Sequence, residues 1–136
     1  KALLVAKENA MALGLTARVE FMHSNWCEKV SGEFDIIISN PPYIPTDVIP
    51  TLAPEVSQFE PKLALDGGKD GFSCYRKIIE SLPRIMAKDG FAAFELGIGQ
   101  QRGMEVLAVE NGLEVVGVRH DLGGVARCII LKHKAT

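Results

Sequence analysis

Residues 34–43 carry the sequence FDIIISNPPY, and this stretch decides the fold. Its first six residues are mostly apolar and rich in β-branched side chains, which predicts a short, buried strand of a parallel sheet. Pro41 and Pro42 end the strand, because proline has no N–H to donate to a neighbouring strand. In open α/β sheets, ligands bind at the carboxyl ends of the strands. The sequence therefore predicts that Asn40 and the Pro41 carbonyl lie in a binding site.

Helices and strands alternate along most of the chain, which predicts a parallel sheet. Helices are expected at residues 2–13, 72–87 and 100–111, and strands at 18–22, 34–39, 91–96, 113–119 and 126–132. We expect Gly14 to end the first helix, Pro83 to break or kink the second, and residues 88–90 to form a turn. No helix separates the last two strands, so they should form an antiparallel hairpin at the sheet edge. Residues 46–65 include several prolines, which predicts a long and mostly irregular loop of the kind that is usually functional.

The chemistry of Asn40 suggests what binds there. An asparagine side-chain oxygen and the Pro41 carbonyl make a pair of hydrogen-bond acceptors, and this pair fits the two hydrogens of a planar –NH2 group. The aromatic ring of Tyr43 can stack on that plane. Acceptors held in this way stabilise positive charge as it develops on the nitrogen. The motif therefore suits transfer of a methyl group to a planar nitrogen, although a proline-rich turn after a strand is the simpler alternative.

Further motifs resemble one family. The stretches that carry the resemblance are Asn40-Pro41-Pro42-Tyr43, Phe59-Glu60-Pro61, Ala64-Leu65 with Gly67-Gly68 and Gly71, and Glu95-Leu96-Gly97 with Gln100. In this order they resemble the HemK/PrmC family, over residues 1 to about 131. Enzymes of that family use S-adenosylmethionine to methylate the side-chain nitrogen of the glutamine in the Gly-Gly-Gln motif of peptide-chain release factors.

The resemblance implies a fold and a domain assignment. The expected fold is α/β, a class I methyltransferase-like doubly wound sheet that is mostly parallel, has an antiparallel last strand and lacks its first strands. Residues 1–136 would then be an incomplete catalytic domain. In the family, a helical domain and the Gly-rich cofactor loop precede the helix that is expected here at residues 2–13.

The resemblance also implies roles for individual residues. The catalytic motif would be Asn40, Pro41, Pro42 and Tyr43, and the substrate would be bound by Asn40, Pro41, Tyr43, Glu60 and Glu95. The cofactor S-adenosylmethionine would be bound by Asn25, Trp26 and Asn40. Asn25 stands where the family usually has an aspartate that binds the adenine amino group, so it keeps an acceptor but not the charge. No metal is expected.

Composition narrows the class of partner. The net charge is −2 and the basic residues are scattered, which favours a protein substrate, a release factor, over direct binding of nucleic acid. Cys27, Cys74 and Cys128 are widely spaced without a Cys-x-x-Cys pair, which is typical of a reduced cytoplasmic protein without zinc. No apolar run predicts membrane insertion. Loss of a neighbouring strand would leave residues 34–39 as an exposed edge, through which the chain could self-associate.

Three alternatives remain open from the sequence. An adenine-N6 methyltransferase of DNA or RNA would share Asn-Pro-Pro-Tyr. A non-catalytic binding module would retain only the substrate side of the site. In a third arrangement, Gly97-Ile98-Gly99 would be the nucleotide-binding turn of a circularly permuted methyltransferase, with Asp121 as the acid that binds the ribose.

Overall fold

The computed structural model describes residues 1–135 and divides into two compact units, which split after Ser31. The N-terminal unit contains one helix, α1 (Ala2–Ala12), and Gly14 follows it with a φ of 69°, as a glycine that ends a helix should. The prediction of a strand at residues 18–22 is wrong: Arg18 lies in a turn, and residues 19–22 have no regular secondary structure and pair with no strand in the described part of the chain. Alternating side chains do not make a strand without a neighbouring backbone to receive its hydrogen bonds.

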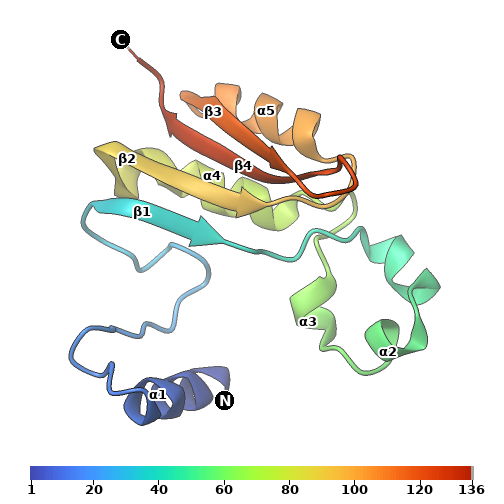
Figure 1. Cartoon of the computed structure of the whole chain (residues 1–136), viewed down its shortest axis with the longest axis horizontal. Helices are drawn as coiled ribbons and strands as arrows, with labels where there is room; N and C mark the ends of the chain where they lie inside the picture. Colours follow the sequence, from blue (N-terminus) through green and yellow to red (C-terminus); the bar gives the residue numbers. More distant parts are fainter. Residues whose placement is uncertain (136) are drawn as a thin grey trace. The chain divides into compact units, whose positions relative to one another are not determined.

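The second unit is built on a four-stranded sheet (Figure 1). Its strands are β1 (Phe34–Ser39), β2 (Met86–Glu95), β3 (Leu113–His120) and β4 (Ala126–His133), in the order β1-β2-β4-β3. β1 and β2 are parallel, and β4 lies antiparallel between β2 and β3. β1, β2 and β3 therefore point the same way and the last strand opposes them. This confirms the expected fold class and the antiparallel hairpin.

Two helices cover one face of this sheet. Helices α4 (Ser73–Ile85) and α5 (Gln101–Glu110) contact each other, and each contacts strands of the sheet (Figure 1). The largest buried side chains between these layers are Tyr75, Phe94, Ile79, Leu82, Leu96, Met104, Leu113, Ile129 and Leu131. The rings of Tyr75 and Phe94 meet edge to face with their centroids 6.2 Å apart. These contacts hold the carboxyl end of β2 rigidly against α4.

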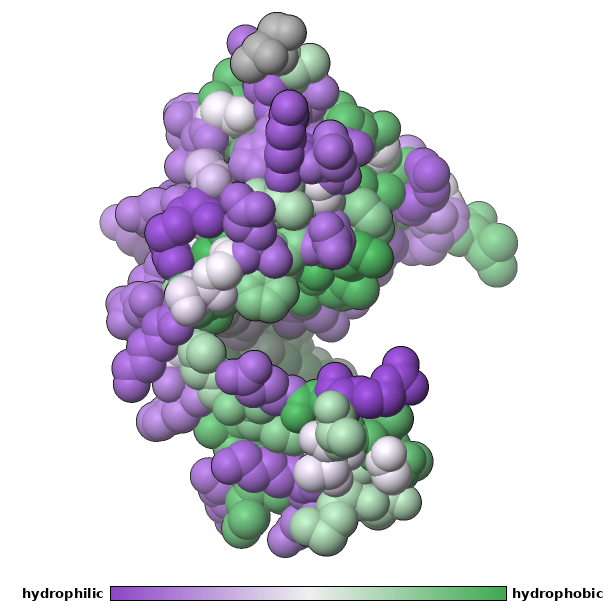
Figure 2. Space-filling model, turned by 90° about the vertical axis from the view of Figure 1, so that its left-hand side faces the viewer, coloured by the Kyte–Doolittle hydropathy of each residue, from purple (hydrophilic) through white to green (hydrophobic). Residues whose placement is uncertain are grey.

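β1 is less buried than its sequence predicts. It has the predicted bounds, but it pairs only with β2 among the described strands, so it is an edge strand. Ile36 is 55% exposed and Ile38 79% exposed. Their alternate neighbour Ile37 is half-buried, consistent with the two-residue period of a strand. Apolar residues lie among polar ones on the molecular surface that the space-filling view shows (Figure 2).

Three loop and helix predictions need correction. Residues 88–90 are part of β2 and not a separate turn, because the β1–β2 register shifts between Phe34 and Ile36 and absorbs the extra residues in the strand. Helix α4 continues past Pro83 to Ile85, so the proline does not break it. The excursion after Tyr43 is also less irregular than predicted, since it forms three short helical turns: η1 (Thr46–Thr51), α2 (Pro54–Ser57) and α3 (Lys62–Leu65).

The two ends of this excursion are tied together. Ile44 donates its N–H to the Leu65 carbonyl at 3.2 Å, and its own carbonyl accepts the Gly67 N–H at 2.8 Å. The Thr46 hydroxyl donates to Asp66 Oδ1 at 2.6 Å. The excursion therefore starts and ends beside Tyr43. None of the helices in the described residues has both the length and the hydrophobicity that crossing a bilayer requires.

Candidate functional site

A hollow of about 500 Å³ lies where β1 and β2 end. Its lining residues are Ile38, Ser39, Asn40, Ala93, Phe94, Glu95, Arg127 and Cys128. Ser39 pairs with Phe94 in the parallel β1–β2 register, so Asn40 and Glu95 follow those two residues at the same edge of the sheet. Two residues predicted to bind the substrate from separate motifs are thus brought into one hollow, whose size is typical of a small-molecule site.

Asn40 itself is exposed, and within residues 1–135 no hydrogen bond ties its side chain to another residue. Its neighbours in the motif are held more firmly, because Pro41 is buried and Pro42 is half-buried. The polar end of Asn40 therefore faces solvent from a stiff backbone. That is the arrangement expected of a side chain that binds a ligand.

Tyr43 is anchored by its hydroxyl group. The hydroxyl donates to Glu95 Oε1 at 3.0 Å, across a separation of 52 residues. Burial raises the pKa of Tyr43, and the hydrogen bond to Glu95 raises it further, so the hydroxyl stays protonated and remains a donor at neutral pH. The ring lies close to Gly97, where an added Cβ would come within 2.6 Å of Tyr43 Cδ2. The predicted stacking of Tyr43 on a substrate group stays a prediction, while its bond to Glu95 was not predicted.

Tyr43 also lines a second hollow, of about 480 Å³. Arg127 lines both hollows. Its Nε donates to Asp121 Oδ2 at 3.3 Å, and its Nη1 donates to the Leu96 carbonyl at 3.4 Å. Arg127 was not predicted to lie in the site, because its place depends on the insertion of β4 beside β2, and no local pattern marks that contact.

Glu60 does not join this group in the described structure. It is exposed between α2 and α3, and it lines neither of the two hollows. Its predicted role in substrate binding stays a prediction. Across the described residues, no group of three or more His, Cys, Asp or Glu side chains is placed to hold a metal ion.

Asn25 and Trp26, predicted to bind the cofactor, lie in the N-terminal unit. Asn25 is exposed and donates its side-chain N–H to Glu28 Oε1 at 3.0 Å, which leaves its amide oxygen as the group that can accept a hydrogen bond. That oxygen is of the right kind for an adenine amino group. Trp26 has a φ of 52°, a value that residues other than glycine rarely adopt. Asn25 thus fits an adenine amino group chemically, and the roles of both residues stay predictions.

Comparisons with known proteins agree with this geometry. The family model described as "Methyltransferase small domain" matches residues 1–53, which include the Asn40 motif. Release factor glutamine methyltransferase from Rhodospirillum rubrum is 43% identical over 134 residues, covering 98% of this chain and 41% of that protein. The same enzyme from Agrobacterium fabrum is 41% identical over 131 residues, covering 96% of this chain and 45% of that protein. The chain thus spans less than half the length of these curated relatives.

A solved structure shares the fold. Ribosomal protein L11 methylase from Lactobacillus delbrueckii subsp. bulgaricus superposes with a TM-score of 0.67 and 18% identity, covering 98% of this chain and 53% of that one. The sheet and the site at its carboxyl edge therefore define a class I methyltransferase fold. Within that class, the chain belongs to the HemK/PrmC family, whose curated relatives are named release factor glutamine methyltransferases.

Proposed function

We propose that the whole protein carrying this chain methylates the side-chain nitrogen of the glutamine in the Gly-Gly-Gln motif of a peptide-chain release factor. The observation that carries the proposal is Asn40, exposed and without a protein partner in residues 1–135, in one hollow with Glu95. Relatives at 41–43% identity over nearly the whole chain support the same substrate. S-adenosylmethionine is the proposed cofactor, and action in the cytoplasm is part of the proposal.

The residues of this chain would bind and orient the acceptor. S-adenosylmethionine supplies a methyl group on a positively charged sulfur. The Asn40 side-chain oxygen and the Pro41 carbonyl would accept the two N–H groups of the glutamine amide, which fixes the nitrogen for attack and stabilises its growing positive charge. As the bond from the methyl carbon to the amide nitrogen formed, the bond from that carbon to the sulfur would break and leave a neutral thioether, and the nitrogen would lose one proton to water. Tyr43, held by Glu95, would form the wall against which the amide plane lies.

The predicted site residues would have different roles. Asn40, Pro41, Tyr43, Glu60 and Glu95 would serve the substrate side, and Asn25 and Trp26 the adenine side of the cofactor. We also propose that residues 1–136 form an incomplete catalytic domain. The turn at Gly97 does not favour the permuted alternative, because the Gly97 N–H already donates to Gln100 Oε1 at 2.9 Å and is not available to a cofactor.

An adenine-N6 methyltransferase would use the same pair of acceptors, so the test compares the two substrates. The whole protein is incubated with labelled S-adenosylmethionine and either a release factor or duplex DNA. We expect label in the release factor, and none when its Gly-Gly-Gln glutamine is replaced by glutamate. Label in DNA and none in the factor would refute the proposal. Absence of label in both would favour a non-catalytic binding module.

A further inference from the structure

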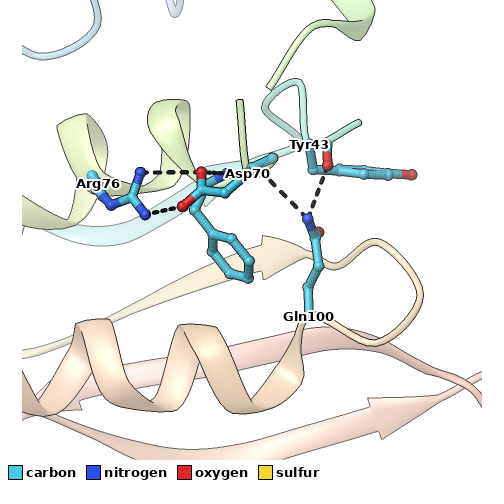
Figure 3. A network of polar contacts seen from close by, with 6 residues as sticks. Tyr43, Asp70, Arg76 and Gln100 are labelled. Atoms are coloured by element: carbon cyan, nitrogen blue, oxygen red, sulfur yellow. Dashed lines mark hydrogen bonds and ion pairs between the residues drawn. The ribbon is translucent and has the colours of Figure 1, made fainter. Parts of the chain in front are cut away.

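Gln100 has no role in the proposed chemistry, yet it is the one buried polar side chain among the described residues, at 8% exposure. Its Oε1 accepts the Gly97 N–H at 2.9 Å and the Tyr75 hydroxyl at 3.3 Å. Its Nε2 donates to the Tyr43 carbonyl at 2.8 Å and, over a longer 3.5 Å, to the Gly71 carbonyl. Figure 3 shows the Gln100 amide pointing at the Tyr43 carbonyl. We call these five residues the Gln100 cluster.

The cluster satisfies the Gln100 amide. A glutamine amide has two N–H donors and an oxygen with two acceptor positions, and the four contacts engage all of them. The contact with Tyr75 is weak, because the single hydroxyl proton of Tyr75 is shared with the Glu95 carbonyl at the shorter distance of 2.6 Å. Gln100 lines the hollow of about 480 Å³ beside Tyr43, but its amide is engaged within the protein. Its contacts instead join three segments that are far apart in the chain: the loop after β1, the loop before α4 and the turn after β2. A buried polar network with every member satisfied makes such a junction rigid.

The loop after β1 needs support from outside. Pro41, Pro42 and Pro45 have no N–H group, so this part of the backbone has few donors with which to fix itself. Ser39 is fixed by its pairing with Phe94. The Tyr43 carbonyl, held by Gln100, is the next fixed point along the chain. The reactive side chain of Asn40 lies on the short, stiff stretch between these two points.

Missing side chains allow this close approach. A Cβ at Gly97 would come within 2.6 Å of Gln100 Oε1, and a Cβ at Gly67 within 2.8 Å of the Tyr43 backbone. Real Cβ atoms do not approach so closely, so glycine at both positions is a condition for the Gln100–Tyr43 contact. The hydrogen bond from Gln100 to the Tyr43 carbonyl thus explains why the sequence motifs have glycine at positions 67 and 97.

We propose that Gln100 is a positioning residue for methyl transfer: by holding the Tyr43 carbonyl, it sets the direction in which Asn40 presents its oxygen to the acceptor nitrogen. The expected effect on the rate of methyl transfer rests on the proposed function. The Gln100 cluster itself rests on the structure alone. A displacement of about 1 Å in a reacting geometry can cost about 10²-fold in rate. Gln100 would act through Tyr43, because its amide is engaged within the protein.

Hydrogen exchange on the unmodified chain tests the cluster without any assay of activity. Gln101 is the matched control, because it is the next residue and its amide donates only to the side chain of Glu105, at 2.8 Å. We expect the Gln100 side-chain N–H protons to exchange at least about tenfold more slowly than those of Gln101, as buried and bonded groups do. Equal exchange rates would overturn the proposal.

Kinetics of two glutamate variants test the positioning role in the whole protein. Gln100→Glu keeps the acceptor for Gly97 and Tyr75 but loses the N–H that holds the Tyr43 carbonyl, whereas Gln101→Glu makes the same chemical change at a half-buried contact outside the cluster. We expect Gln100→Glu to lower kcat about 10²-fold with little change in KM, and Gln101→Glu to leave both unchanged. If Gln100→Glu does not fold, the uncharged Gln100→Met replaces it with the same expected loss of kcat per folded molecule. Equal kcat values for the Gln100 and Gln101 variants would overturn the inference. If the wild-type protein methylates no release factor, the proposed function is overturned instead. The hydrogen-exchange measurement then decides whether the Gln100 cluster exists.

Discussion

Replacing Asn40 with alanine should separate catalysis from stability. The Asn40 side chain is exposed, and in residues 1–135 it makes no hydrogen bond to the protein, so its removal breaks no contact that folding depends on. Surface substitutions of this kind change the free energy of unfolding by no more than about 0.5 kcal/mol. The folded population should therefore be unchanged.

The effect on methyl transfer should be far larger. Asn40→Ala removes one of the two acceptors proposed to hold the reacting nitrogen. Loss of a single preorganised polar contact to developing charge lowers kcat by about 10²–10³-fold, which is about 2.7–4 kcal/mol of transition-state stabilisation. Because the lost interaction strengthens only as charge develops, kcat and kcat/KM should fall together and KM should change little.

The assay is steady-state methylation of a release factor by the whole protein, with urea unfolding measured on the same samples. Asn111→Ala is the control, since Asn111 donates its side-chain N–H to the Leu107 carbonyl at 2.8 Å in the last turn of α5. That variant should lose about 0.5–1.5 kcal/mol of stability and keep its kcat. An Asn40→Ala enzyme that retains more than about a tenth of its activity, where a loss of 10²–10³-fold is expected, would refute the assigned role.

The parts of the fold that could be predicted are those set by local sequence. The bounds of β1 are those predicted, because a β-branched run that ends in two prolines leaves no choice of where the strand stops. Helix α5 and the strands of the β3–β4 hairpin also begin and end within two residues of their predicted bounds, because local sequence sets those bounds too. The strand expected at residues 18–22 was wrong, because strand formation depends on a pairing partner that a local pattern does not show.

The site was only half predictable. Asn40 and Glu95 stood out in the sequence because Asn40 follows an apolar strand and Glu95 ends one, and parallel pairing brings such residues to one edge. The contacts that hold them did not stand out. Tyr43 meets Glu95 across 52 residues and Gln100 meets Tyr43 across 57, and both contacts depend on the close approach of backbones at glycine. The sequence shows that glycines are present there but not which segments they allow to meet.

Two further predictions concern the supports of the site. Tyr75 is fully buried, and its hydroxyl donates to the Glu95 carbonyl at 2.6 Å. Tyr75→Phe leaves that acceptor without its partner, so it should lower the free energy of unfolding by about 1–3 kcal/mol. An unchanged urea midpoint would contradict this prediction. Two hydrogen bonds to the Asp66 carboxylate hold its pKa below the usual value of 3.8: the larger effect comes from the Thr46 hydroxyl and the smaller one from a backbone N–H. Because the folded-state pKa of this carboxyl is lower than the unfolded-state pKa, its stabilising effect is complete at neutral pH and is lost as the pH falls through the folded-state pKa. Asp66→Asn should therefore melt at a lower temperature than the wild type at neutral pH, and the difference in melting temperature should shrink as the pH falls below 3.8. If the difference in melting temperature stays constant across that pH range, the charge of the Asp66 carboxylate does not stabilise the contact between the two ends of the excursion after Tyr43.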